Sequence, residues 1–196
     1  MLASLSALTA PACRGETMGS DRRRDVITLR PDDMRRAGQL IAISDLEAPL
    51  LRAAFAFCEQ LRGQRRFLDR REISPRLFKP YLRNLALIRV EDEGRDYEFR
   101  IVGDAFHVLH GFSAQGLRIE GVDRISPGYG SASRRIFDRV RKLGSAIALR
   151  GQMERPDADG SIILQESLYL PLGPGTTTID HILCFACFDV RSVVDP

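Results

Sequence analysis

The chain of 196 residues has few cysteines and no long apolar run. Its four cysteines lack the regular spacing of a disulfide framework, so the sequence does not predict a small disulfide-stabilised fold. No apolar run reaches the roughly 18 residues that a transmembrane helix needs. The first residues also lack the basic segment and strongly apolar stretch of a secretory signal peptide. We therefore expect a cytoplasmic protein that does not enter a membrane.

Signatures of the common enzyme classes are absent as well. The chain contains no GxSxG, Walker A or HExxH motif, and no glycine-rich dinucleotide fingerprint with the strand and helix that it requires. After residue 190 there is also no room for a kinase, nucleotide cyclase or phosphodiesterase output domain. We therefore expect a protein that is not an enzyme and that has no output domain of its own.

The charge of the chain is close to balanced. There are 29 basic residues against 26 acidic ones, and most of the excess falls within the first 40 residues. A nucleic-acid-binding domain usually presents a strongly basic face. The composition therefore does not favour a nucleic-acid partner.

Composition divides the chain into a leader, a body and a tail. Residues 1–43 mix small residues with charge clusters and predict a flexible leader, in which 26–29 (VITL) are the one candidate strand. Met18 is an alternative start to Met1. The body, residues 44–192, is long enough to bury a proper core. Residues 193–196 form a short tail.

A helix opens the body. Apolar residues recur with helical spacing after the candidate N-cap pair Ser44-Asp45, which predicts an amphipathic helix over 45–62 that ends near Gly63. Its apolar surface is wider than one stripe. We therefore expect one face to pack on the body and another to contact a second copy of the chain.

The rest of the body alternates between strand and helix signals. Asp104 is a candidate N-cap for a short helix that Gly111 ends, and 113–130 is rich in loop-forming residues. The predicted helix 131–143 has a basic side opposite its apolar side, formed by Arg134, Arg135, Arg139, Arg141 and Lys142. This basic side could bind phosphate or simply face solvent, and we interpret it as facing solvent. The predicted strands cover residues 84–91, 95–102, 145–153, 161–172 and 179–190.

This order predicts an α+β fold. A hairpin, a helical crossover and a three-strand meander form a five-stranded antiparallel sheet with the crossover helices on one face. Strand alternation predicts that Tyr97, Phe99 and Ile101 lie on one side of that sheet.

The stretch FRIVGDAFHVLHG, residues 99–111, gives a resemblance. Together with the lead-in ISPRLFKPYLRNLALIRVE, the later GLRIEGV and the final pair LQESLYLPL and HILCFACFDV, it resembles a PAS domain. It is similar in particular to the stand-alone PAS proteins of proteobacteria. The resemblance covers residues 45–190.

The resemblance implies a sensory or interaction module. In such proteins the sheet and helices enclose a pocket that in some members holds haem, flavin, another chromophore or a small metabolite. It implies a homodimer through helix 45–62 and an unidentified signalling partner, and it does not name a cofactor. The alternatives are a ligand-free interaction or dimerisation module and, third, a haem or metal protein. The candidate ligand-binding residues are Phe99, Phe106, His110, Tyr129 and Phe137.

Two motifs have the residue types of a metal or cofactor site, but we interpret both as structural. His107 and His110 lie on one side of a helix, but zinc needs a third and usually a fourth ligand, and His181 belongs to the last strand. One histidine suffices for haem, yet no second haem signature accompanies it. We therefore expect packing or hydrogen bonding and no metal site.

The CxxC pair Cys184 and Cys187 lies on a predicted strand, where residues three apart face opposite sides, so we interpret both as buried apolar residues. The asparagine-cysteine-arginine-phenylalanine run of the light-sensing PAS subclass is absent.

Overall fold

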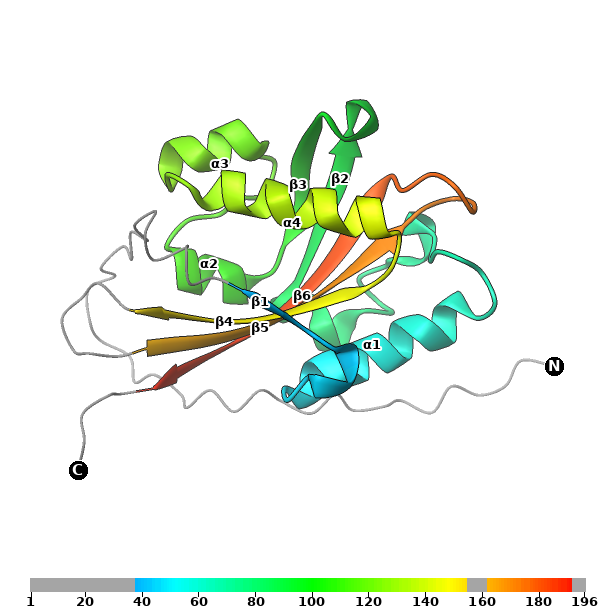
Figure 1. The fold of residues 1–196 in the computed structure, drawn as a ribbon, viewed down its shortest axis with the longest axis horizontal. Helices are drawn as coiled ribbons and strands as arrows, with labels where there is room; N and C mark the ends of the chain where they lie inside the picture. Colours follow the sequence, from blue (N-terminus) through cyan, green and yellow to red (C-terminus); the bar gives the residue numbers. More distant parts are fainter. Residues whose placement is uncertain (1–37, 155–161, 192–196) are drawn as a thin grey trace.

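Strands from distant parts of the chain form one antiparallel sheet in the computed structural model, which describes residues 38–154 and 162–191. The strand order is β1-β4-β5-β6-β2-β3 (Figure 1). The strands are β1 (Gln39–Ile41), β2 (Leu85–Glu91), β3 (Asp96–Val102), β4 (Ile147–Glu154), β5 (Ile162–Leu172) and β6 (His181–Arg191). The helices are α1 (Pro49–Arg62), α2 (Asp104–His110), α3 (Ile119–Ile125) and α4 (Tyr129–Leu143), with short 3₁₀ helices at Ile43–Asp45, Arg70–Glu72, Lys79–Asn84 and Asp92–Gly94.

The predicted architecture is confirmed. The β2–β3 hairpin, the crossover through α2, α3 and α4, and the β4–β5–β6 meander form the five expected strands of a PAS-like fold. β1 is a sixth strand that pairs with β4, and it lies within the range that the sequence assigned to the leader. The candidate strand at 26–29 lies outside the described residues.

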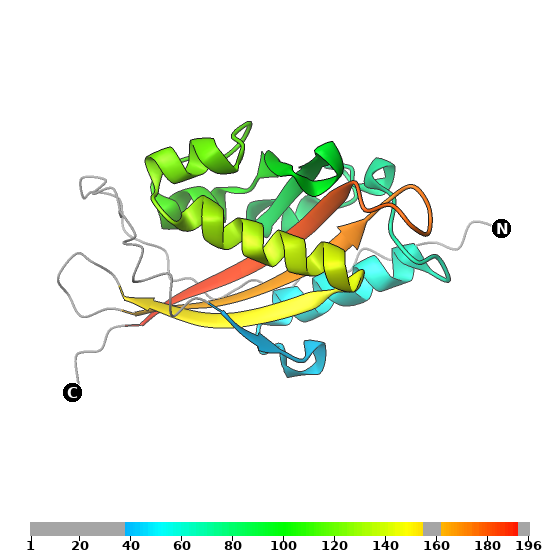
Figure 2. The ribbon, with the colours of Figure 1, turned by 45° about the horizontal axis from the view of Figure 1, so that its top comes forward.

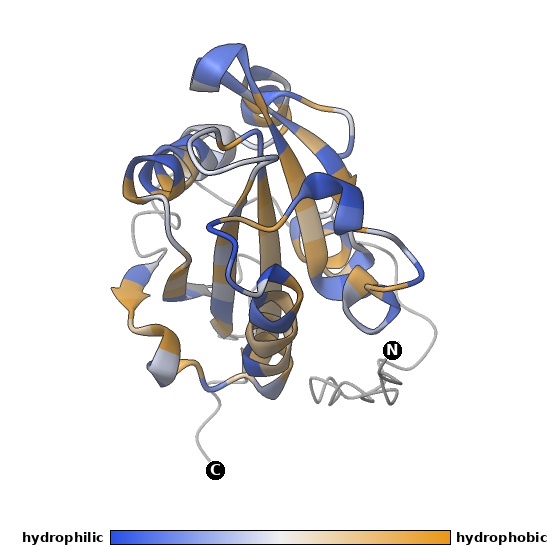
Figure 3. Cartoon of the chain, turned by 90° about the vertical axis from the view of Figure 1, so that its right-hand side faces the viewer, coloured by the Kyte–Doolittle hydropathy of each residue, from blue (hydrophilic) through white to orange (hydrophobic). Residues whose placement is uncertain are grey.

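Helices cover both faces of the sheet, α4 on one side and α1 on the other (Figures 1 and 2). The sheet therefore lies between two apolar clusters, and Figure 3 shows its strands as mostly apolar ribbons. The cluster under α1 includes Leu51, Leu87, Leu168 and Phe185. The cluster under α2, α3 and α4 includes Ile88, Tyr97, Phe99, Phe106, Val122, Phe137, Tyr169 and Cys184.

A β-bulge in the first hairpin corrects one prediction. Ile88 pairs with Phe99, whereas Leu87 pairs with Ile101, so the register shifts by one residue at Arg100. The extra residue turns the side chains that follow it to the opposite face. Phe99 accordingly packs under α4, while Ile101 packs under α1. The prediction that Ile101 shares a face with Phe99 is wrong.

The N-terminus of α1 lies four residues later than predicted. Ser44 and Asp45 form part of a 3₁₀ helix, and α1 begins at Pro49 after Ala48, whose side chain cannot cap. Proline suits the first helical position because its missing N–H would have no partner there. The cap comes instead from Glu166 on β5, whose carboxylate accepts hydrogen bonds from the backbone N–H groups of Glu47 and Ala48.

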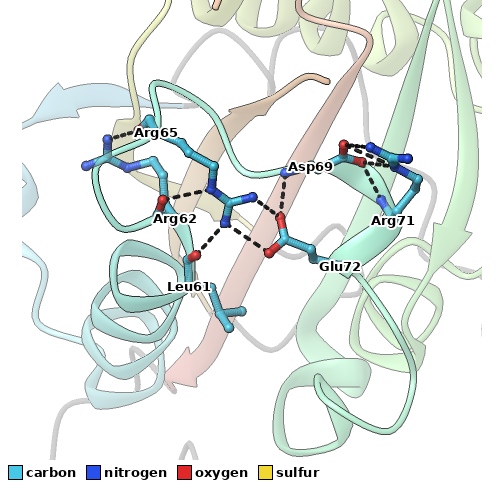
Figure 4. Close-up of polar contacts among 6 residues, drawn as sticks. All are labelled: Leu61, Arg62, Arg65, Asp69, Arg71 and Glu72. Carbon is cyan, nitrogen blue, oxygen red and sulfur yellow. Dashed lines mark hydrogen bonds and ion pairs between the residues drawn. The ribbon is translucent and has the colours of Figure 1, made fainter. Parts of the chain in front are cut away.

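The C-terminus of α1 is tied to the following loop by Arg65 (Figure 4). Its guanidinium donates to both carboxylate oxygens of Glu72, at 2.7 and 2.9 Å, and to the carbonyls of Leu61 and Arg62 at the end of the helix. Glu72 also accepts from the backbone N–H of Asp69, which completes a capping box for the 3₁₀ helix that follows. These bonds satisfy carbonyls that the helix itself leaves unpaired.

The segment expected to be loop-rich contains a helix, α3. Ile119 and Val122 are buried beneath it, and their packing outweighs the glycines that suggested a loop. Gly130 at the start of α4 allows this approach, because a Cβ there would lie 2.4 Å from the carbonyl oxygen of Ile119. The helix predicted at 131–143 thus begins at Tyr129 and, as expected, ends at Gly144 in the left-handed conformation.

Candidate functional site

A cavity lies between the sheet and the helices α2 and α4. Its interior offers about 30 Å³ to the centres of water-sized molecules. Strands β2, β3, β5 and β6 form the floor, α2 and α4 the roof, and residues 112 and 114 one wall. Thirteen side chains line it: Ala86, Ile88, Phe99, Val102, Phe106, His110, Phe112, Ala114, Tyr129, Ser133, Phe137, Tyr169 and Cys184.

Aromatic contacts fix the shape of this cavity. The ring of Phe137 on α4 meets that of Phe99 on β3 edge-to-face, with centroids 5.8 Å apart, and that of Tyr169 on β5 at 6.4 Å. Phe106 on α2 packs edge-to-face on Phe188 of β6 at 5.7 Å. Such pairs contribute about 0.5–1.5 kcal/mol each beyond simple burial. The helices are thereby held over the sheet at positions that leave a gap between them.

All five residues predicted to bind a ligand line this one cavity. That they bind a ligand remains a prediction. Sequence reasoning missed the polar groups of the lining, namely Ser133, Tyr169 and Cys184. Tyr169 and Cys184 lie on predicted strands, but that they are direct partners depends on the β5–β6 register, which the sequence does not show. Ser133 lies one turn after Tyr129 on the same face of α4.

His110, the last residue of α2, is the most unusual group of the cavity. It is 8% exposed, and its Nδ1 atom has no hydrogen-bond partner among the residues that the structure describes. Its ring lies against Tyr129, with centroids 4.3 Å apart, and near Phe112 at 6.2 Å. Burial lowers the pKa of His110 to about 4, so the imidazole is neutral at pH 7. A buried unpaired nitrogen costs free energy that a ligand would recover.

His107 does not share this environment. It lies one turn earlier on α2 and is exposed, whereas His110 is buried. Although they lie three residues apart on one helix, the two imidazoles therefore have different environments. Over residues 38–154 and 162–191, no group of three or more His, Cys, Asp and Glu side chains is arranged to hold a metal ion.

The remaining polar groups of the cavity are uncharged at neutral pH. Burial raises the pKa of the Tyr129 phenol, which the Ser133 hydroxyl hydrogen-bonds, and it also raises the pKa of Tyr169 well above its ordinary value. It also raises the pKa of the Cys184 thiol, which hydrogen-bonds to Tyr169, to about 12. Within residues 38–154 and 162–191, no Asp, Glu, Lys or Arg lines the cavity. The site therefore offers aromatic surface and neutral hydrogen-bonding groups.

The CxxC interpretation is confirmed by the strand geometry. Cys184 belongs to the cluster under α4 and faces the cavity, whereas Cys187 belongs to the cluster under α1. The two sulfurs therefore lie on opposite faces of the sheet, as residues three apart on a strand must. Both cysteines are buried.

The basic side of α4 is partly structural. Arg134 bonds Asp96 at 3.0 Å and Arg141 donates to the carbonyl of Glu93, so both tie the helix to the β2–β3 hairpin. Arg135 and Arg139 are exposed. No helix of the described segments is long and apolar enough to span a membrane.

Comparison with known proteins adds little to this picture. No family model matches the chain, and no curated protein matches it. A solved structure described as "Flavin Analogue Sheds Light on Light-Oxygen-Voltage Domain Mechanism" is similar, with a TM-score of 0.41 and 14% identity. The match covers 58% of this chain and 82% of that one. A similarity of this strength carries no argument about ligand or activity, and the fold of this chain is established by its own strand order and registers.

Proposed function

We propose that the protein is a sensory or regulatory module of the stand-alone PAS type, which binds a small ligand in the cavity and transmits its presence to a signalling partner. The observation that carries this proposal is the buried side chain of His110, which lines the cavity among aromatic rings and whose Nδ1 has no hydrogen-bond partner in the part of the chain that the structure describes. A folded core rarely leaves such an atom unpaired unless a ligand or water completes it. The convergence of all five expected residues on that cavity supports the same proposal.

The effect of ligand binding would be transmitted from the cavity through the sheet to α1. The sheet is a single layer, with Tyr169 and Cys184 on the cavity side and Leu168 and Phe185 on the α1 side. A ligand that favours one packing of α2 and α4 on the sheet shifts the population toward that packing. Helix α1 packs directly on the opposite face, so its position changes with the shape of the sheet. In a homodimer through α1, that change would reach the partner chain.

A haem or flavin does not fit this cavity. Its free volume of about 30 Å³ is far below the roughly 300–1,000 Å³ of ordinary small-molecule pockets. The same small volume favours the second candidate, a ligand-free module for interaction or dimerisation. In that case water alone would occupy the space beside His110.

Native mass spectrometry of the freshly purified full chain separates the two candidates. We expect a mass excess over the 22.0 kDa chain that corresponds to a bound small molecule. The variant Ala86→Val adds two methyl groups into the cavity from β2 and should abolish that excess. The matched variant Ala42→Val changes an exposed residue and should keep it. A wild-type protein without bound molecule would overturn the ligand proposal and establish the ligand-free module.

A further inference from the structure

We infer that the cavity selects a small uncharged molecule with a hydroxyl group, and that His110 anchors this hydroxyl. The inference rests on the proposed function, since it requires that the cavity be occupied by a ligand. It goes further by stating the chemical class of that ligand and the atom that recognises it. Size, charge and hydrogen bonding each support one part of it.

The size of the cavity sets an upper limit on the ligand. A single water needs about 10–15 Å³ of such space, and an engineered apolar cavity of about 150 Å³ holds a benzene ring. The present cavity offers about 30 Å³, which lies between these two values and nearer the first. A ligand that enters without displacing α2 or α4 therefore has only a few non-hydrogen atoms. An aromatic ring is too large.

The lining excludes ions. The titratable groups that face the cavity from all elements around it are His110, Tyr129, Tyr169 and Cys184, and all are neutral at pH 7. A carboxylate or ammonium ligand would lose its hydration and find no opposite charge. The aromatic side chains favour instead the apolar part of a small neutral molecule. The ligand is therefore uncharged.

The unpaired nitrogen of His110 selects the polar group. A neutral imidazole carries one N–H donor and one acceptor, and either can lie at Nδ1. A carbonyl can pair with only one of these tautomers, because it only accepts. A hydroxyl both donates and accepts, so it pairs with Nδ1 in either tautomer. A hydroxyl therefore completes this atom irrespective of the position of the proton.

Titration of the full ¹⁵N-labelled chain with ethanol, acetate and xenon tests each part. Ethanol is a small neutral alcohol, acetate is a charged molecule of similar size, and xenon is an apolar probe without hydrogen bonding. We expect ethanol to produce a saturable shift of the His110 Nδ1 resonance and of amides around the cavity. Acetate should leave these signals unchanged. Xenon should perturb the cavity amides without the Nδ1 signature of a hydrogen bond.

Two variants on the same helix provide the comparison. His110→Phe removes the nitrogen and should weaken ethanol binding by about tenfold or more, the loss expected for an unmade buried hydrogen bond. His107→Phe makes the same change at an exposed position one turn away and should bind ethanol as the wild type does. If His110→Phe does not fold, the Nδ1 shift in the wild-type protein alone decides the question.

Several results would overturn the inference. Saturable acetate binding would refute the charge argument, and equal ethanol binding by His110→Phe would refute the anchor. Absence of any ethanol shift would mean that water alone pairs with His110. A co-purified ligand in the native mass spectrum that is charged or lacks a hydroxyl would end the inference while leaving the proposed function intact. If no molecule co-purifies, the proposed function fails as well.

Discussion

The most direct test of the fold concerns Glu166, which connects the sheet to α1. This residue lies on β5 and is 8% exposed. Its carboxylate accepts from the backbone N–H groups of Glu47 at 3.0 Å and Ala48 at 2.8 Å, and from the Arg150 guanidinium at 2.6 Å. A carboxylate at this position satisfies two donors at the start of the helix and lies at the positive end of its dipole. We therefore expect Glu166→Ala to destabilise the protein.

The size of the effect follows from these bonds. Loss of a helix N-cap costs about 0.5–2 kcal/mol, and a hydrogen bond to a charged group contributes about 1.5–3 kcal/mol. Glu47 is exposed and the side chain of Arg150 is 37% exposed, so water can replace some of the hydrogen bonds that these residues lose with Glu166. We expect a decrease of about 2–3 kcal/mol in the free energy of unfolding. Glu166→Gln keeps an acceptor oxygen but not the charge, so its decrease should be smaller.

Urea unfolding of the full chain, followed by circular dichroism, measures these differences. The control is Glu120→Ala, which removes a carboxylate from an ion pair with Arg124 whose side chains are 78% and 74% exposed. Exposed pairs of this kind contribute little, so this variant should lose less than about 1 kcal/mol. If Glu166→Ala and Glu120→Ala lose equal amounts, the account of α1 as a helix capped from β5 is wrong.

Three further predictions concern other parts of the molecule. The pKa of His110 is 6.5 in the unfolded chain and about 4 in the folded protein, so the unfolded chain binds more protons between these two pH values. The free energy of unfolding should therefore fall by on the order of 3 kcal/mol as the pH drops from 6.5 to 4. Urea titrations of His110→Phe should lack this component of the pH dependence. Gly103→Ala places a Cβ 2.2 Å from the carbonyl oxygen of Leu82 and should lower the free energy of unfolding by about 1–3 kcal/mol. In the control Gly121→Ala, the nearest atom to the new Cβ lies at 3.6 Å, so thermal unfolding should show an unchanged or increased stability. Light scattering should give twice the mass of the 22.0 kDa chain, and Ala56→Glu on the exposed side of α1 should give a monomer; a wild-type monomer would refute the dimer.

The elements that sequence reasoning predicted correctly are those whose signal is local. The alternation of Tyr97 and Phe99 and the left-handed glycines at 111 and 144 depend only on near neighbours in the chain. The bulge at Arg100 could not be predicted in this way, because it depends on the register with β2. The start of α1 was also inaccessible, because its cap is Glu166, 119 residues away from Glu47.

The candidate site shows the same division. The resemblance brought together five aromatic and histidine residues that the structure places around one cavity. The sequence did not distinguish His110 from His107, although one is buried and the other exposed. That difference depends on which side of α2 meets β6 and Tyr129, and only the three-dimensional packing of the helix decides it.

The two halves of the proposed mechanism meet on strand β5. Side chains alternate along a strand, so Ser167 and Tyr169 lie on the cavity side, while Glu166 and Leu168 lie on the α1 side. Because a protein core is closely packed, a ligand beside Tyr169 that shifts the roof would, under the proposed function, also change the local twist of β5. Because Glu166 holds the first residues of α1 through its carboxylate, the start of this helix would follow such a change in the strand. In the proposed mechanism, the cap that stabilises α1 would therefore also connect the cavity to the expected dimer contact.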